Sequence, residues 1–157
     1  MGGNSVSQRT GRHWPWLVQA LGFSGAAFGT VFIVSVVHVK NPHGADIWLG
    51  VILVASVLLL PTLAVVTSDN FLSAPLVLVS AVAGLCVGDF FPYAMNWWSL
   101  DVDNYNSSSD APGIRSLWFR LLFFGFYATM LGFALGFIEW VVIRFIRGFL
   151  RGRCVAQ

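Results

Sequence analysis

The stretch from Ala74 to Met95 reads APLVLVSAVAGLCVGDFFPYAM and contains a single charged side chain, Asp89. A helix needs about 20 predominantly apolar residues to cross the roughly 30 Å hydrocarbon core of a bilayer. A membrane-spanning β-strand would alternate apolar and polar residues, whereas this stretch is almost continuously apolar. The stretch therefore predicts a transmembrane helix.

Three further stretches have the same character, and the whole chain shares their composition. Of its 157 residues, 57% are hydrophobic and 10% are charged. Soluble domains average about 45–50% apolar and about 25% charged residues, so a soluble fold, a disordered chain and a nucleic-acid-binding surface are all excluded. We predict an all-α, four-helix (tetraspan) bundle that forms one integral membrane domain over residues 1–157, with spans at 16–39, 47–66, 74–95 and 117–145.

The distribution of basic residues predicts how the bundle is oriented. The segments between the spans are short except for 99–116, and positive side chains favour the cytoplasmic side. Both termini are predicted to be cytoplasmic, because six basic residues then lie inside and three outside: Arg9, Arg12, Arg144, Arg147, Arg151 and Arg153 against Lys40, Arg115 and Arg120.

Two motifs outside the spans suggest covalent modification. Asn106 begins an Asn-Ser-Ser sequon in the segment 99–116, where glycosylation would be extracytoplasmic; such short sequons also arise by chance. Cys154 begins a C-terminal Cys-Val-Ala-Gln, which has the form of a prenylation box. The alternative is a tail that merely ends this way, because a fourfold-spanning protein gains little anchoring from one lipid chain.

Small residues recur every fourth position in three of the predicted helices. Such rows allow helix backbones to approach closely in lipid, where van der Waals packing drives association. We predict that they pack the four helices together; alternatively, one row binds a partner protein or a second copy. The rows are Gly25 and Gly29; Ser80, Gly84 and Gly88; and Ala128, Gly132 and Gly136.

Ionisable residues within predicted spans suggest either a functional site or a structural pair. Asp89 shares a helix face with Tyr93 and Asn96, while His38 and Arg120 are expected at the same membrane depth. These groups form either an ion or proton site or a structural Asp89–Arg120 pair with His38 at the helix interface.

Glu139 is the other acidic residue within a span. It shares a face with Gly132 and Gly136, so we expect a partner from another helix, with Gln19 and Arg12 as candidates. The alternative is a glutamate at the membrane interface beside Trp140.

The sequence carries no motif for a metal, a cofactor or a paired nucleophile and base, so we predict that the protein is not an enzyme. In size and in the placement of its termini it is similar to small tetraspan groups, among them the MARVEL-type proteins, which is a similarity of architecture alone. We predict an accessory, scaffold or assembly subunit that acts through helix packing with membrane lipids, other transmembrane proteins or itself. The alternative is a small oligomeric channel or transporter that uses Asp89, His38 or Glu139.

Overall fold

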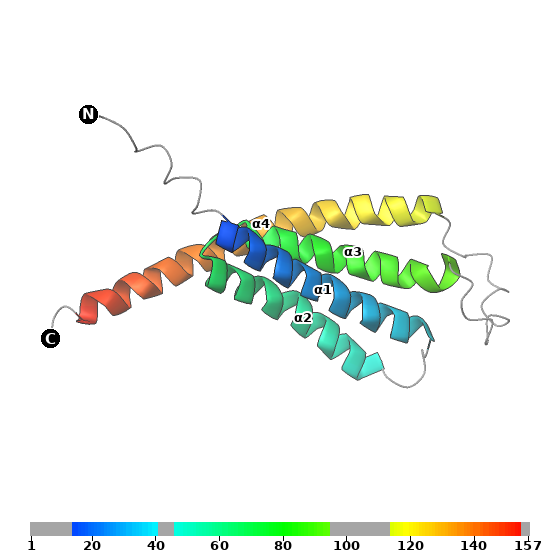
Figure 1. Cartoon of the computed structure of the whole chain (residues 1–157), viewed down its shortest axis with the longest axis horizontal. Coiled ribbons are helices and arrows are strands. Elements are labelled where there is room, and N and C mark those ends of the chain that lie inside the picture. The colour runs from blue at the N-terminus through cyan, green and yellow to red at the C-terminus, as the bar shows by residue number, and fades with distance from the viewer. Residues whose placement is uncertain (1–13, 41–45, 95–113, 155–157) are drawn as a thin grey trace, which may run out of the picture.

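The computed structural model describes residues 14–40, 46–94 and 114–154, and all of these except the short α2–α3 connection are helical. The described residues form four helices (Figure 1), which confirms the all-α prediction. Each helix is long and apolar enough to cross a membrane. Their bounds are α1 Trp14–Lys40, α2 Asp46–Ser68, α3 Ser73–Ala94 and α4 Ile114–Cys154.

The bundle has two ends, which we name by the connections that they carry. The α1–α2 end is where α1 finishes and α2 begins, and the α2–α3 end is where α2 turns into α3. In Figure 1, α1 begins and α4 finishes toward the α2–α3 end. This common end is what the predicted topology requires, while the side of the membrane on which it lies stays a prediction.

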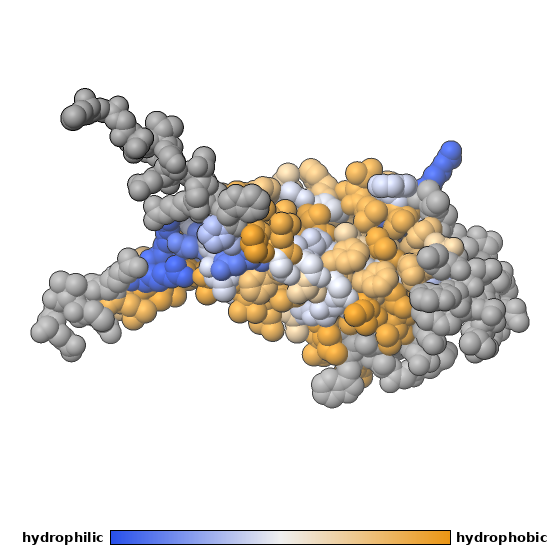
Figure 2. All heavy atoms as spheres, viewed as in Figure 1, coloured by the Kyte–Doolittle hydropathy of each residue, from blue (hydrophilic) through white to orange (hydrophobic). Residues whose placement is uncertain are grey.

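Helix α3 is central, because it makes the two most extensive contacts in the bundle, with α1 on one side and with α4 on the other. The core between α1, α2 and α3 consists of small or β-branched side chains that are at most 2% exposed: Ala27, Val31, Ala64, Val77 and Ala81. Side chains of this size keep the helix axes close, and close packing is the main attraction available between helices in lipid. Hydrophobic side chains cover much of the middle of the bundle, and hydrophilic ones gather toward its ends (Figure 2).

Helix α4 is longer than its predicted span. It has 41 residues, which corresponds to roughly 60 Å at about 1.5 Å per residue. The predicted span ended at residue 145, but the arginine-rich residues that follow continue the helix, because no proline interrupts them. At its other end the helix begins at Ile114, so the last residues of the predicted segment 99–116 belong to α4. The C-terminal part of α4 continues past the other three helices (Figure 1).

The α2–α3 connection is a tight turn held by its own polar groups. Asp69 has a φ of 52°, a left-handed conformation that Asp tolerates better than most residues and that ends a helix. The Asn70 side-chain oxygen accepts a hydrogen bond from the Leu72 amide at 3.0 Å, and the Ser73 hydroxyl donates to the Asn70 carbonyl at 2.7 Å. These bonds reverse the chain within four residues and place α3 beside α2.

Candidate functional site

Two glycines of α3 lie directly against the backbone of α1. A Cβ atom built on Gly84 would lie 2.5 Å from the Phe28 carbonyl oxygen, and one on Gly88 would lie 2.7 Å from the Ser35 Cβ. Real Cβ atoms essentially never come so close, so the α1–α3 contact depends on glycine at both positions.

The glycines of α4 make the matching contact on the other side of α3. A Cβ on Gly132 would lie 2.5 Å from the Pro75 Cα, and one on Gly136 would lie 2.7 Å from the Phe71 carbonyl oxygen. Ala128, one turn earlier in the same row, is buried. The remaining residue of the predicted rows, Ser80, donates its hydroxyl hydrogen bond to the Leu76 carbonyl of its own helix at 2.8 Å.

Gly25 and Gly29 do not pack inside the bundle, so the intramolecular role predicted for them needs correction. A Cβ added at either position meets no atom within 4 Å among the described residues. The buried face of α1 includes Ala27, and each glycine lies two residues from it, about 200° around the helix. Spacing groups these glycines on one face, but the face points away from the other helices.

A cavity of about 310 Å³ with both polar and apolar walls lies toward the α1–α2 end. Among its lining residues are Ser35 and His38 of α1 and Asp89 of α3. The Ser35 hydroxyl is buried and has no hydrogen-bond partner in the described part of the chain. The structure therefore brings His38 and Asp89 to one site, as their predicted depth suggested, and adds Ser35. The full lining is Val34, Ser35, His38, Gly50, Leu53, Leu85 and Asp89.

The Asp89–Arg120 pair that the sequence suggested does not form as a contact. Among the described residues no ion pair joins the two side chains within 4.0 Å, and the Arg120 side chain is exposed. Arg120 and His38 lie close enough to act electrostatically on Asp89. The reason is geometric: Arg120 stands in the first turns of α4, where that helix presents an exposed face.

Four predicted site residues fall outside what the structure describes. Asn96 and Asn106 lie between α3 and α4 in the part of the chain that is not described. Tyr93 and Cys154 lie within helices, but their side chains are outside the described part. The polar row, the sequon and the prenylation motif therefore stay predictions.

Glu139 has a partner on α2 that the sequence did not suggest. Of the predicted candidates, Gln19 is exposed on α1 and Arg12 lies outside the described residues. The Thr62 hydroxyl lies 3.0 Å from Glu139 Oε1 and 3.1 Å from the Leu58 carbonyl oxygen of its own helix, so its one hydrogen is shared between these two acceptors. Glu139 Oε2 is buried and has no hydrogen-bond partner among the described residues. Thr62 follows Pro61, which is buried within α2. The carboxyl group thus joins α4 to α2, away from the cavity that contains Asp89.

Replacing Thr62 by valine is expected to lower the free energy of unfolding by about 1 kcal/mol. Hydrogen bonds between transmembrane helices average about 0.6 kcal/mol, while a buried acceptor left without a donor costs about 1–3 kcal/mol. Titration with sodium dodecyl sulfate in mixed micelles measures the change. Thr67→Val is the control, because the Thr67 hydroxyl bonds to carbonyls of its own helix; equal losses in the two variants would contradict the cross-helix role of Thr62.

A second set of contacts, missed in the sequence, fastens the α2–α3 turn to α4. Arg147 pairs with the Asp69 carboxylate at 3.1 Å and donates to the Val66 carbonyl at 3.1 Å. The Trp140 indole donates to the Asp69 carbonyl at 3.2 Å, and the Arg144 guanidinium lies over its ring. Both partners of the Arg147–Asp69 pair are largely exposed, so this cluster positions the turn more than it stabilises the bundle.

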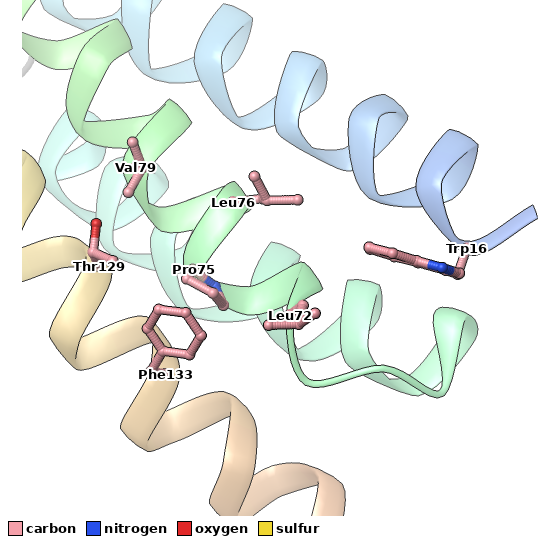
Figure 3. A pocket seen from close by; sticks show the side chains of 7 residues that line it. All are labelled: Trp16, Leu72, Pro75, Leu76, Val79, Thr129 and Phe133. Atoms are coloured by element: carbon pink, nitrogen blue, oxygen red, sulfur yellow. The ribbon is translucent and has the colours of Figure 1, made fainter. Parts of the chain in front are cut away.

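An apolar groove of about 340 Å³ runs along α3 between α1 and α4 (Figure 3). Trp16 of α1 and Phe133 of α4 stand on its two sides, and Pro75 and Leu76 of α3 form its floor. The indole nitrogen of Trp16 is buried without a hydrogen-bond partner. The groove offers hydrocarbon contact and no group suited to chemistry.

Among the described residues, no three His, Cys, Asp or Glu side chains are grouped so that they could hold a metal ion. No protein-family model matches this chain, and no curated protein or solved structure matches it either. The features of the described residues that bear on function are a bundle of apolar helices in which α3 makes the largest contacts, a cavity lined in part by Asp89, and an open glycine face on α1.

Proposed function

We propose that the protein is a non-enzymatic accessory or assembly subunit of a membrane, and that it binds another transmembrane helix through the outward face of α1. The observation that carries the proposal is the open glycine face, which comprises Gly22, Gly25, Ala26 and Gly29. These residues are spaced i, i+3, i+4 and i+7, so they lie on one side of the helix.

The open glycine face has the shape that helix association in lipid requires. A Cβ at Gly22, Gly25 or Gly29 meets nothing within 4 Å in the described structure. Val18 and Ile33, which flank the face along the helix, are 59% and 60% exposed. Small residues between larger apolar ones form a shallow notch that admits a second helix backbone.

A comparison with the glycine rows of α3 and α4 strengthens the inference from the open glycine face. Gly84 and Gly88 of α3 and Gly132 and Gly136 of α4 are used inside the chain, against backbone or Cβ atoms. Glycine inside a helix costs roughly 1 kcal/mol relative to alanine in helix propensity. The uncovered glycines of α1 carry that cost, and no contact with the described residues of this chain offsets it. This supports a partner helix whose packing against the row would offset the cost.

A channel or transporter is the second candidate, and the cavity that contains Asp89 favours it. Directly beyond the cavity, however, the α1–α3 contact is closed by Val31, Val77 and Ala81, which are at most 2% exposed. The other membrane carboxylate, Glu139, faces Thr62 on a different side of α2. A path across the membrane through one copy is therefore not supported, and unchanged ion flux of Asp89→Asn in proteoliposomes would remove this candidate.

Replacing Gly25 or Gly29 by leucine is expected to reduce the bound partner at least tenfold without changing stability. A leucine side chain fills the notch and separates the two backbones, while its Cβ meets no atom within 4 Å among the described residues of this chain. The measurement is native mass spectrometry of tagged protein purified from its own membranes in mild detergent. The mass distinguishes a second copy from another subunit.

Gly125→Leu is the matched control, because a Cβ on Gly125 of α4 would also meet no atom within 4 Å among the described residues. It should keep the partner. A wild-type chain that is monomeric in both detergent and lipid nanodiscs would contradict the proposal. So would a Gly29→Leu chain that keeps its partner in full.

A further inference from the structure

We propose that the cavity toward the α1–α2 end is a binding site for a small organic cation, a primary ammonium group on a short apolar body. We call it the Asp89 cavity, defined by its lining Val34, Ser35, His38, Gly50, Leu53, Leu85 and Asp89. This inference does not depend on the helix-binding role of α1, because the open glycine face and the cavity occupy different sides of that helix.

The charge of the site favours a cation. Asp89 is the carboxylate in the lining, and the described residues place no cationic side chain within 4.0 Å of it. His38 lines the same cavity, and Arg120 acts on Asp89 from α4 without lining it. A carboxylate inside a membrane is costly unless a positive group accompanies it. A ligand with a positive group would complete the site.

The buried hydroxyl specifies what kind of cation fits. Ser35 is 2% exposed, and among the described residues its Oγ has no hydrogen-bond partner. Its side chain is held against α3 at Gly88, where a Cβ would come within 2.7 Å of the Ser35 Cβ. An ammonium group has several donor hydrogens and no acceptor, so it can donate to the Asp89 carboxylate and, once the buried Ser35 hydroxyl turns toward the cavity, to the Ser35 oxygen as well.

The remaining walls specify the body of the ligand. Val34, Leu53 and Leu85 are apolar, and a Cβ at Gly50 would meet nothing within 4 Å, so the α2 side of the cavity is open. The volume of about 310 Å³ is at the lower end of the range of ligand pockets, which run from about 300 to 1,000 Å³. A bare metal ion would leave most of this space and its apolar wall unused. A short alkylammonium ion uses both.

The test measures how a cysteine inside the cavity reacts with charged reagents. Leu53→Cys is placed in a background with Cys86→Ala and Cys154→Ser, and Val34→Cys serves as a second reporter. The reagents are aminoethyl and sulfonatoethyl methanethiosulfonate, with rates normalised to a free thiol. We expect the cationic reagent to react roughly tenfold faster than the anionic one, because Asp89 attracts one and repels the other. We also expect n-butylammonium, and not n-butanol, to protect the cysteine.

Three variants complete the design. Asp89→Asn should bring the normalised rates together and abolish protection, and Ser35→Ala should raise the n-butylammonium concentration needed for half protection. Glu139→Gln is the matched control, since it alters a membrane carboxylate outside the cavity, and it should change neither result. Cysteines unreactive to both reagents at both positions would overturn the proposal. Equal rates that ignore Asp89→Asn, or equal protection by n-butanol, would overturn it too.

Discussion

A Gly84→Leu chain is expected to lose the native bundle, with a fall in the free energy of unfolding of at least about 3 kcal/mol, the upper end of the usual cost of overpacking. The Cβ alone would lie 2.5 Å from the Phe28 carbonyl oxygen and 3.1 Å from the Phe28 Cα. Both are backbone atoms, so no rotamer change can relieve the contact, and α1 must move away from α3. Since α1 and α3 form the most extensive helix contact, their separation also exposes the core around Ala27 and Ala81.

The measurement is the midpoint of unfolding in mixed micelles, together with the elution profile in mild detergent. Gly84→Ala should show the same effect at reduced size, because it adds the clashing Cβ and nothing more. Gly125→Leu adds the same side chain where no atom lies within 4 Å, and it should stay close to wild type. If Gly84→Leu matched Gly125→Leu, the arrangement of α1 against α3 would be wrong.

The second large effect is expected from Gly132→Leu, which should detach α4 from α3. A Cβ at Gly132 would lie 2.5 Å from the Pro75 Cα and 2.9 Å from the Pro75 nitrogen, again backbone atoms that cannot rotate away. The contact of α4 with α2 is much smaller than its contact with α3. The expected loss is therefore also about 3 kcal/mol, but it is confined to α4.

That confinement can be measured. In the Gly132→Leu chain, hydrogen exchange should increase in α4 and in the turn around Asp69, which α4 holds through Arg147 and Trp140. The amides of α1 and the first half of α3 should keep their protection. Uniform loss of protection in all four helices would show that α4 is an integral part of one cooperative core, against the arrangement described here.

The sequence alone was sufficient to predict the helices, but not to predict which residues of neighbouring helices face one another. Each span follows from an apolar run long enough to cross a bilayer, and three of the four bounds agree to within a few residues. The fourth was too short, because hydropathy falls where arginines begin while the helix does not. Hydropathy measures lipid contact, and helix ends are decided by capping and by proline.

The glycine rows show the same limit of prediction from sequence. Spacing of four residues identifies a small-residue face on α1, α3 and α4 alike, but it does not say what lies opposite that face. The faces of Gly84 and Gly132 are covered by α1 and α3 respectively. The face of Gly25 is not, because α1 turns Ala20, Ser24 and Ala27 toward its neighbours.

The contacts of the polar residues depend even more than those of the glycines on how the helices are arranged around the bundle. His38 and Asp89 could be grouped by membrane depth, and they do line one cavity. Thr62 gave no signal, since threonine in helices commonly bonds to its own preceding carbonyls, and Ser35 could only be placed on the helix face of His38. Which of them faces Asp89 or Glu139 is decided by rotations of helices about their axes, and a sequence pattern does not contain these rotations.

Photo-cross-linking in the intact membrane tests the proposal that α1 is covered by this chain on one side and by another transmembrane helix on the other. In the background with Cys86→Ala and Cys154→Ser, benzophenone maleimide is attached to Val18→Cys or Ile33→Cys beside the open glycine face. The control position is Leu122→Cys on α4, where the native side chain is 73% exposed. We predict cross-links to a protein chain from Val18→Cys and Ile33→Cys, lost when Gly29→Leu is added, and cross-links to lipid from Leu122→Cys. Lipid cross-links alone from all three positions would contradict the proposal.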